Sequence, residues 1–219
     1  MPDNNLPSWR QDLKSSRNKE GKSPSNKWIQ LATVSEENEP RLRTVVFRGW
    51  HKDSSMIIFT DRRSEKIGHL KSNPNAEILW FFLKTKSQYR FKGKIRELSD
   101  NKNYWDSLSE KSKSSWFWGS PGEKINPKVQ STHERLSNLP KSENFVVLNF
   151  EIYSVDLLKL EQPVHKRYLW EKVKKWEKVE INPLKEKIFP DPYFKEKINF
   201  LTSVTGFIFL GSYLSLIHI

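Results

Sequence analysis

Basic and hydroxyl side chains gather at the ends of two neighbouring apolar runs, where they could hold a phosphate group. The runs, Thr44–Phe47 and Met56–Phe59, flank a polar turn at His51–Ser55, which predicts an antiparallel hairpin. The donor-bearing side chains at their ends are Arg43, Thr44, Arg48, Thr60, Arg62, Arg63, Ser64 and Lys66. Guanidinium groups bond phosphate oxygens in pairs, and hydroxyls can fill the remaining acceptors, so no glycine-rich loop is required. The same charge density also suits an ordinary solvated surface, so the residues alone leave both interpretations open.

The composition favours one moderate core and an anionic partner. The 219 residues are 36% hydrophobic, and the net charge of +12 points to nucleic acid, a membrane surface or a phosphorylated small molecule. The late lysines are spread among aromatics and glutamates, which favours a solvated face over a nucleic-acid track. The absence of cysteine excludes a disulfide scaffold, and we expect no metal site. The first residues have no apolar secretory segment, so a reducing, cytoplasmic location is expected.

Period-two runs dominate the chain and predict strands, with helices between some of them. The expected strands are Trp28–Val34, Arg41–Trp50, Ser55–Thr60, Ala76–Leu83, Ser87–Leu98, Asn144–Leu160, Arg167–Trp170 and Trp176–Ile181. The expected helices are Trp9–Ser16, Ser64–Lys71, Asn101–Glu110, Lys111–Trp118 and Pro127–Leu139. Gly93 inside a strand indicates a bulge or a close backbone approach. Consecutive strands without βαβ alternation predict a mainly β, α+β fold: an antiparallel β-barrel with peripheral helices.

Three segments are expected along the chain. Residues 1–26 form a polar segment with a short helix, residues 27–183 form the barrel domain, and residues 184–219 form an extension. Ile198–Ile219 contains no Asp, Glu, Lys or Arg, and this uncharged stretch is long enough in principle to span a membrane. Scattered polar residues lower its hydrophobicity. Its end resembles the translation of a sequencing-adapter read. A truncated or artefactual end, a helix on the domain and a membrane anchor stay open, and no membrane association is expected for the protein.

Five motifs in order resemble the pyridoxamine 5′-phosphate oxidase-like FMN-binding proteins. They are QLATVSEENEPRLRTVVFRGW, FTDRRSEK, LWFFLKTKSQYRFKGKIREL, WFWGSPG and the late HKRYLW…INP. The chain is most similar to the subgroup with RTVVFRG and TDxRSxK, and the resemblance covers about Ser8 to Pro183. It implies a Greek-key split barrel of antiparallel strands. It also implies a homodimer, with FMN at the interface touching both subunits.

The resemblance also implies the cofactor contacts. Arg43 would reach the FMN phosphate, the backbone of Val45–Phe47 would run beside the isoalloxazine ring, and Gln88 would come from the other subunit. The full implied set is Arg43, Thr44, Val45, Val46, Phe47, Arg48, Phe59, Thr60, Arg63, Ser64, Lys66, Gln88 and Arg167. Two positions depart from the family pattern. Glu65 replaces an arginine, whose part Arg63 and Ser64 would take, and Leu158 replaces a flavin-contacting tryptophan.

The implied substrate contacts are Arg48, Tyr104, Ser112 and His165, and no catalytic residue is assigned. Leu108 stands where the family has an arginine that grips the substrate phosphate, which removes a charged contact typically worth about 1.5–3 kcal/mol. Lys111 and Lys113 could substitute only as point charges.

The leading hypothesis is an FMN-dependent oxidoreductase that passes hydride from a small molecule to flavin N5, with an unknown substrate. A non-catalytic FMN-binding module is the second hypothesis, motivated by Leu108 and Leu158. A basic nucleic-acid-binding protein is the third, motivated by the charge and the aromatics. A deazaflavin in place of FMN stays open.

Overall fold

The computed structural model describes residues 6–51, 54–124 and 139–183. The helices are α1 (Trp9–Glu20), α2 (Glu65–Ser72), α3 (Lys102–Asp106) and α4 (Glu110–Ser114). The strands are β1 (Trp28–Val34), β2 (Pro40–Trp50), β3 (Met56–Asp61), β4 (Asn75–Phe82), β5 (Ser87–Glu97), β6 (Phe145–Lys159), β7 (Lys166–Glu171) and β8 (Val179–Ile181). The helix expected at Pro127–Leu139 lies, apart from Leu139, outside the described residues, as does the 184–219 extension. Within the described ranges, no helix has the length and apolar character needed to cross a membrane.

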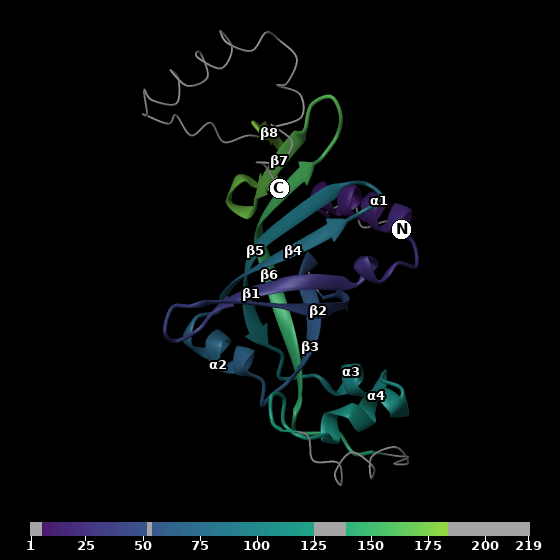
Figure 1. Ribbon diagram of the computed structural model, residues 1–219, viewed down its shortest axis with the longest axis vertical. Coiled ribbons are helices and arrows are strands. Elements are labelled where there is room, and N and C mark those ends of the chain that lie inside the picture. The colour runs from purple at the N-terminus through teal and green to yellow at the C-terminus, as the bar shows by residue number, and fades with distance from the viewer. Residues whose placement is uncertain (1–5, 52–53, 125–138, 184–219) are drawn as a thin grey trace, which may run out of the picture. The chain divides into compact units, whose positions relative to one another are not determined.

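The described strands form one antiparallel sheet that closes on itself (Figure 1). Their order is β3-β2-β1-β4-β5-β6-β7-β8, and β3 pairs in addition with β6, from Met56 opposite Phe150 to Asp61 opposite Phe145. That extra pairing closes β1 to β6 into a barrel, and β7 and β8 continue the sheet beyond it. The predicted antiparallel barrel with peripheral helices is therefore confirmed.

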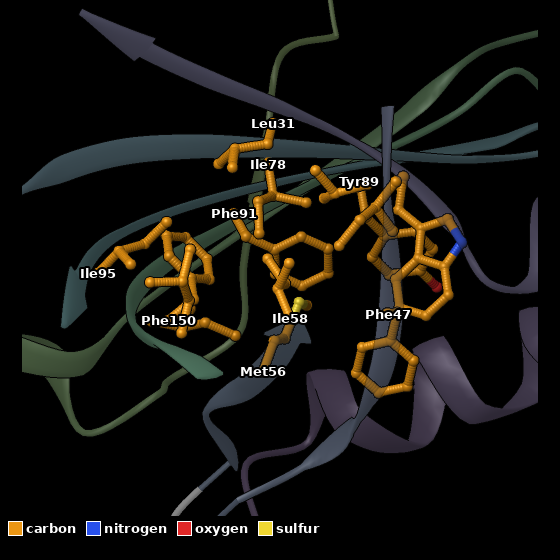
Figure 2. Packing of buried hydrophobic residues seen from close by; sticks show 14 of the residues in the cluster. Leu31, Phe47, Met56, Ile58, Ile78, Tyr89, Phe91, Ile95 and Phe150 are labelled. Atoms are coloured by element: carbon orange, nitrogen blue, oxygen red, sulfur yellow. The ribbon is translucent and has the colours of Figure 1, made fainter. Parts of the chain in front are cut away.

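Inward-facing residues of the strands fill the barrel (Figure 2). In β1 every second residue is buried, from Ile29 through Leu31 to Thr33, as the strand period requires. Figure 2 shows Phe47, Met56 and Ile58 of β2 and β3 in this core, together with Phe91 of β5 and Phe150 of β6. The core thus joins all six barrel strands, which fixes where each strand ends.

A second apolar cluster lies on the outer face of β3 and β6. It consists of Ile57, Phe145 and Val147, covered by Trp105 of α3. The rings of Trp105 and Trp116 stand 5.3 and 5.0 Å from the ring of Phe145. Both tryptophans therefore pack against the sheet, and the helices here are shorter than the expected Asn101–Glu110 and Lys111–Trp118.

Helix α1 extends further than the sequence predicted. We expected it to end at Ser16 and a loop to follow from Arg17, but the helix continues to Glu20. Tertiary contacts support the extra turn, because the Arg17 guanidinium lies 4.9 Å from the centre of the Phe47 ring. The buried Glu20 carboxylate also accepts hydrogen bonds from the Lys84 backbone N–H (3.1 Å) and the Ser25 hydroxyl. Phe47 and Lys84 are distant in sequence, so local propensity could not reveal their contacts with the helix.

The bulge expected at Gly93 is present. The pairing of β5 with β6 shifts between Lys92 opposite Ser154 and Gly93 opposite Ile152, leaving one extra residue in β6. A Cβ atom at Gly93 would lie 2.6 Å from Cε2 of Phe150 and closer still to the carbonyl oxygen of Glu151. Only glycine therefore lets the two strands approach this closely.

We expect Gly93→Ala to lower the free energy of unfolding by about 1–3 kcal/mol, because the added methyl group meets backbone that cannot move aside cheaply. Urea denaturation followed by circular dichroism measures this change. Gly68→Ala in α2 is the matched control. No heavy atom lies within 4 Å of its added Cβ, and alanine favours a helix by up to about 1 kcal/mol. Equal stability of Gly93→Ala and the wild type would show that the bulge relaxes.

Candidate cofactor-binding site

Strands β2 and β3 diverge where the predicted site residues lie. Their pairing runs from Trp50 opposite Met56 to Phe47 opposite Ile58 and goes no further. Beyond that point β2 stays paired with β1, whereas Phe59–Asp61 stays paired with β6. The segment from Pro40 to Val46 consequently has no described strand on its second edge. The predicted cofactor residues of β2 and β3 lie on the two sides of this divergence.

A hydroxyl and ammonium group forms where β3 turns into α2. The Lys66 ammonium donates to the hydroxyl of the buried Thr60 at 2.9 Å, and the Thr60 and Ser64 hydroxyls lie 3.3 Å apart. Ser64 is the N-cap residue of α2, as expected, but its hydroxyl donates to the Asp61 carbonyl at 2.6 Å and does not cap the helix. Three of the predicted residues are thereby brought together.

Arg43 approaches this group from β2. One of its terminal nitrogens, Nη1, donates to the Thr33 hydroxyl at 2.6 Å and to the Leu31 carbonyl at 3.3 Å. In the described part of the chain, no carboxylate oxygen lies within 4.0 Å of a charged nitrogen of Arg43 or Lys66. The two cations are therefore held by neutral oxygens, which leaves their charge available to an anion.

Electrostatics confirm that these cations lie close together. Burial lowers the pKa of Lys66, and the neighbouring Arg43 guanidinium lowers it further, while Asp61 and Glu65 oppose the shift. Burial is also the main cause that lowers the pKa of Arg43. Two partly desolvated cations beside the Thr60 hydroxyl form a donor set that fits a phosphate group, since charge and hydrogen-bond demand are both met.

The side chains of β2 divide between the core and the outside. Val45 and Phe47 are buried in the barrel, so only their backbone can meet a ligand, as the resemblance implied. Thr44, Val46 and Arg48 point to the other face of the strand, as the strand period requires. These outer side chains can reach a bound molecule, as can Arg43, which has the inward parity of Val45 but lies beyond the end of the β2–β3 pairing.

A second group links Arg48 to residues of the α3 region. The Arg48 guanidinium lies 5.2 Å from the centre of the Phe59 ring, and that ring meets Tyr104 edge-on at 5.8 Å. The Tyr104 hydroxyl and His51 Nδ1 are 3.2 Å apart. Sequence reasoning missed His51, because it lies in a predicted turn and its partner is 53 residues away.

Gln88 and Arg167 form a third group on the far part of the sheet. Both pair with Leu158, so the three residues make one row across β5, β6 and β7. The Arg167 guanidinium donates to both oxygens of Asp156, at 2.9 and 2.6 Å, and Arg90 binds the same carboxylate. Asp156 was not foreseen, because its pairing with Arg167 depends on the strand register.

Three remaining predicted residues make contacts elsewhere. Arg63 pairs with Asp61 at 2.8 Å and donates to the Trp118 carbonyl at 3.1 Å. The Ser112 hydroxyl lies 2.9 Å from that of Ser109 on the exposed face of α4. His165 Nδ1 lies 3.0 Å from the Glu161 carbonyl. Within the described ranges, none of these three side chains forms a hydrogen bond or ion pair with Lys66 or Tyr104.

Comparison with known families matches residues 6–99 to the family described as pyridoxamine 5′-phosphate oxidase, FMN-binding domain. The chain is 35% identical over 148 residues to the Arabidopsis thaliana protein named pyridoxine/pyridoxamine 5′-phosphate oxidase 2, covering 61% of this chain and 74% of that protein. It is 36% identical over 86 residues to a pyridoxine/pyridoxamine 5′-phosphate oxidase of Deinococcus deserti, covering 38% of this chain and 40% of that one.

Two solved structures share the fold. A pyridoxamine 5′-phosphate oxidase-related, FMN-binding protein from Nostoc punctiforme superposes with a TM-score of 0.72 at 28% identity, covering 81% of this chain and 99% of its own. PhzG from Burkholderia lata, solved with tetrahydrophenazine-1-carboxylic acid, gives a TM-score of 0.67 at 20% identity, covering 80% and 89%. At that identity the second likeness concerns the fold alone.

We expect Asp156→Asn to lower the free energy of unfolding near neutral pH by about 1–3 kcal/mol, because it leaves two arginines without their carboxylate. Burial raises the pKa of Asp156, but hydrogen bonds from Arg167 and Arg90 outweigh burial and hold it below 3.8. The stabilisation is therefore complete above pH 3.8 and is lost as the pH falls through the lowered pKa. Urea denaturation across the acid range measures both effects.

Asp106→Asn is the control for this prediction, because its carboxylate is 50% exposed and pairs only with Lys102 along one helix turn. It should change stability by less than about 0.5 kcal/mol. If Asp156→Asn kept the wild-type pH dependence in acid, the shared carboxylate would not be a stabilising element.

Proposed function

The chain belongs to the pyridoxamine 5′-phosphate oxidase family of FMN-binding proteins, and we propose that it is a homodimeric flavoprotein oxidoreductase acting on a small molecule. FMN, the cofactor expected from the sequence, is the cofactor of that family. The observation that carries the proposal is a pair of cations, Arg43 and Lys66, that form no ion pair with any described carboxylate and lie beside the Thr60 hydroxyl. These three residues would hold the FMN phosphate.

When bound, FMN supplies a hydride acceptor at N5 of its ring system. The chain's own residues bind and orient it. The open edge of β2 offers backbone groups of Thr44–Val46 to the flavin ring, and Arg48 places a positive charge on the same outer face. Burial lowers the pKa of Arg48, and no described carboxylate forms an ion pair with it, so its charge stays available to an anionic or electron-rich partner.

Two subunits would complete each site. Thr60 pairs with Val146 near the start of β6, whereas Gln88 and Arg167 flank Leu158 near its end. About 40 Å of extended strand separates Val146 from Leu158 at roughly 3.3 Å per residue. One FMN molecule is too short to reach both places on the same chain. The separation supports a homodimer in which Gln88 and Arg167 of one subunit approach the flavin of the FMN held by Arg43, Thr60 and Lys66 of the other.

The helices that would contact the substrate, α3 and α4, differ from a helix that binds a substrate phosphate. Leu108 packs against the apolar cluster around Trp105, and Lys113 pairs with Glu110 at 2.9 Å. The Tyr104 hydroxyl and His51 Nδ1, which lie 3.2 Å apart, remain as hydrogen-bonding groups. The Phe59 ring contacts both Tyr104 and the Arg48 guanidinium and so links these groups to Arg48. These groups favour a substrate with hydrogen-bonding atoms that does not depend on a bidentate phosphate contact.

A non-catalytic FMN-binding module is the second candidate. Arg167 is occupied by Asp156, and Leu108 offers no charge, so two positions that would serve a reaction are committed to the fold. Tight flavin binding without reduction by any pyridoxine or pyridoxamine 5′-phosphate donor would favour this module over the oxidoreductase.

The test of the proposed function is the absorbance spectrum of the purified full-length protein after incubation with FMN and washing. We expect retained flavin bands at about one flavin per subunit. Arg43→Ala should weaken FMN binding about 10- to 100-fold, because it removes a charged hydrogen-bonding partner worth about 1.5–3 kcal/mol.

Arg41→Ala is the matched control, since Arg41 lies on the same strand but is exposed and paired with Glu39. Its FMN affinity should stay within about twofold of the wild type. A folded wild-type protein that retains no flavin would reject the proposal, and salt-sensitive binding of an oligonucleotide would then point to a nucleic-acid partner.

We expect FMN affinity to fall as the pH rises through the alkaline range below 10.5. The pKa of Lys66 is lowered by burial and by Arg43, so its ammonium loses the proton earlier than an ordinary lysine does. Only the charged form attracts phosphate, and bound phosphate in turn retains the proton, so affinity must decrease with deprotonation. FMN titrations at a series of pH values measure this, and Lys66→Arg should flatten the profile.

Lys71→Arg, on the exposed end of the same helix, should keep the wild-type profile. A wild-type affinity that stays constant up to pH 10.5 would remove Lys66 from the phosphate contacts.

A further inference from the structure

Arg43 is tethered on one side and free on the other. A guanidinium has five N–H donors, two of them on Nη1. The two Nη1 donors are taken by the Thr33 hydroxyl at 2.6 Å and the Leu31 carbonyl at 3.3 Å. The Nε–Nη2 edge makes no hydrogen bond in the described part of the chain. That edge carries the parallel N–H pair that matches two oxygens of a phosphate.

Thr33 is well placed to hold Nη1. It is the last inward-facing residue of β1 that is buried, with an exposed fraction of 2%. Leu31 pairs directly with Arg43 in the β1–β2 register, so Thr33 is the diagonal neighbour of Arg43 on the same face. A β-branched side chain has few rotamers, so the hydroxyl stays where the strand puts it.

The Thr33 hydroxyl is in turn oriented by His69. Arginine only donates, so Thr33 accepts from Nη1 and its own proton is free for another partner. His69 is a residue of α2 with a buried side chain, and its Nδ1 lies 3.2 Å from the same oxygen. We assign Nδ1 as the acceptor of that proton, which places the ring proton on Nε2.

One helix serves both parts of the site. Lys66 and His69 are three residues apart in α2, with Lys66 meeting Thr60 and His69 meeting Thr33. The position of α2 therefore determines the position of the Lys66 ammonium and, through Thr33, that of the Arg43 guanidinium.

We propose that Thr33 and His69 are positioning residues that hold the Nε–Nη2 edge of Arg43 toward the cofactor phosphate and so make the site selective for FMN over riboflavin. The inference rests on the proposed function, because it concerns the same phosphate. Neither residue touches the phosphate. They act by fixing Arg43 before binding, which reduces the conformational entropy lost when the complex forms.

Thr33→Val removes the hydroxyl and keeps the shape of the side chain. We expect it to weaken FMN binding about three- to tenfold, the factor for leaving one long side chain unfixed. Riboflavin lacks the phosphate, so its affinity should stay within about twofold of the wild type. Thr33→Ser restores the hydroxyl and should recover most of the FMN affinity. Flavin fluorescence titrations of the full-length protein measure all of these constants.

Each outcome of these titrations decides something. Unchanged FMN affinity in Thr33→Val would overturn the inference, while wild-type FMN binding would leave the proposed function intact. An equal loss for FMN and riboflavin would show a purely structural role and would also overturn it. A wild-type protein that binds neither flavin would reject the proposed function and the inference together.

A measurement on the wild type covers the case in which Thr33→Val does not fold. Nitrogen-15 NMR of the histidine side chains in mildly alkaline buffer distinguishes the two neutral tautomers of His69. We expect a bare Nδ1 and a protonated Nε2. A protonated Nδ1 would overturn the arrangement, because Nδ1 would then donate to Thr33 and leave the hydroxyl proton without this acceptor.

Discussion

The pairing of β3 with β6 is the constraint on which the other features depend. It closes the barrel, because Met56–Ile58 pair with β2 on one edge and with β6 on the other. Phe59–Asp61 continue along β6 without β2, so the divergence of β2 and β3 begins where β3 is held by β6 alone. Strand β6 then continues past the bulge at Gly93 and carries Leu158 with its row of partners to the other end of the sheet. One long strand thus sets both the position and the separation of the two halves of the proposed site.

The cations of this basic chain fall into two classes by their partners. Arg62, Arg63 and Arg167 are matched with carboxylates, which suits residues that fasten strands and loops. Arg43 and Lys66 are matched with neutral oxygens and lie close enough to lower the pKa of Lys66. Partly buried charge without an ion-pair partner opposes folding, which is why we propose these two residues as the phosphate site. Net charge alone could not separate the two classes.

The sequence was sufficient for features that depend on short-range pattern. The hairpin of β2 and β3, the strand expected at Ala76–Leu83 and the bulge at Gly93 follow from short apolar runs and from glycine chemistry, and all three are present. The strand ends at Phe82, however, and Leu83 is exposed. Features that join distant residues were beyond it. The end of α1 depends on the rings and amides that meet Arg17 and Glu20, and the Thr33–His69 contact joins residues 36 positions apart. The grouping of predicted site residues into three places likewise needed the strand register.

The open edge of β2 has a consequence for the protein without its cofactor. An extended segment with unpaired backbone groups, from Pro40 to Val46, is a template onto which a strand of another molecule can add. Arg41 and Arg43 place charge along this segment, which discourages such addition. A bound flavin would cover the same backbone groups, so the cofactor would also act as a shield against aggregation. A shortage of riboflavin would then reduce the amount of usable protein as well as its activity.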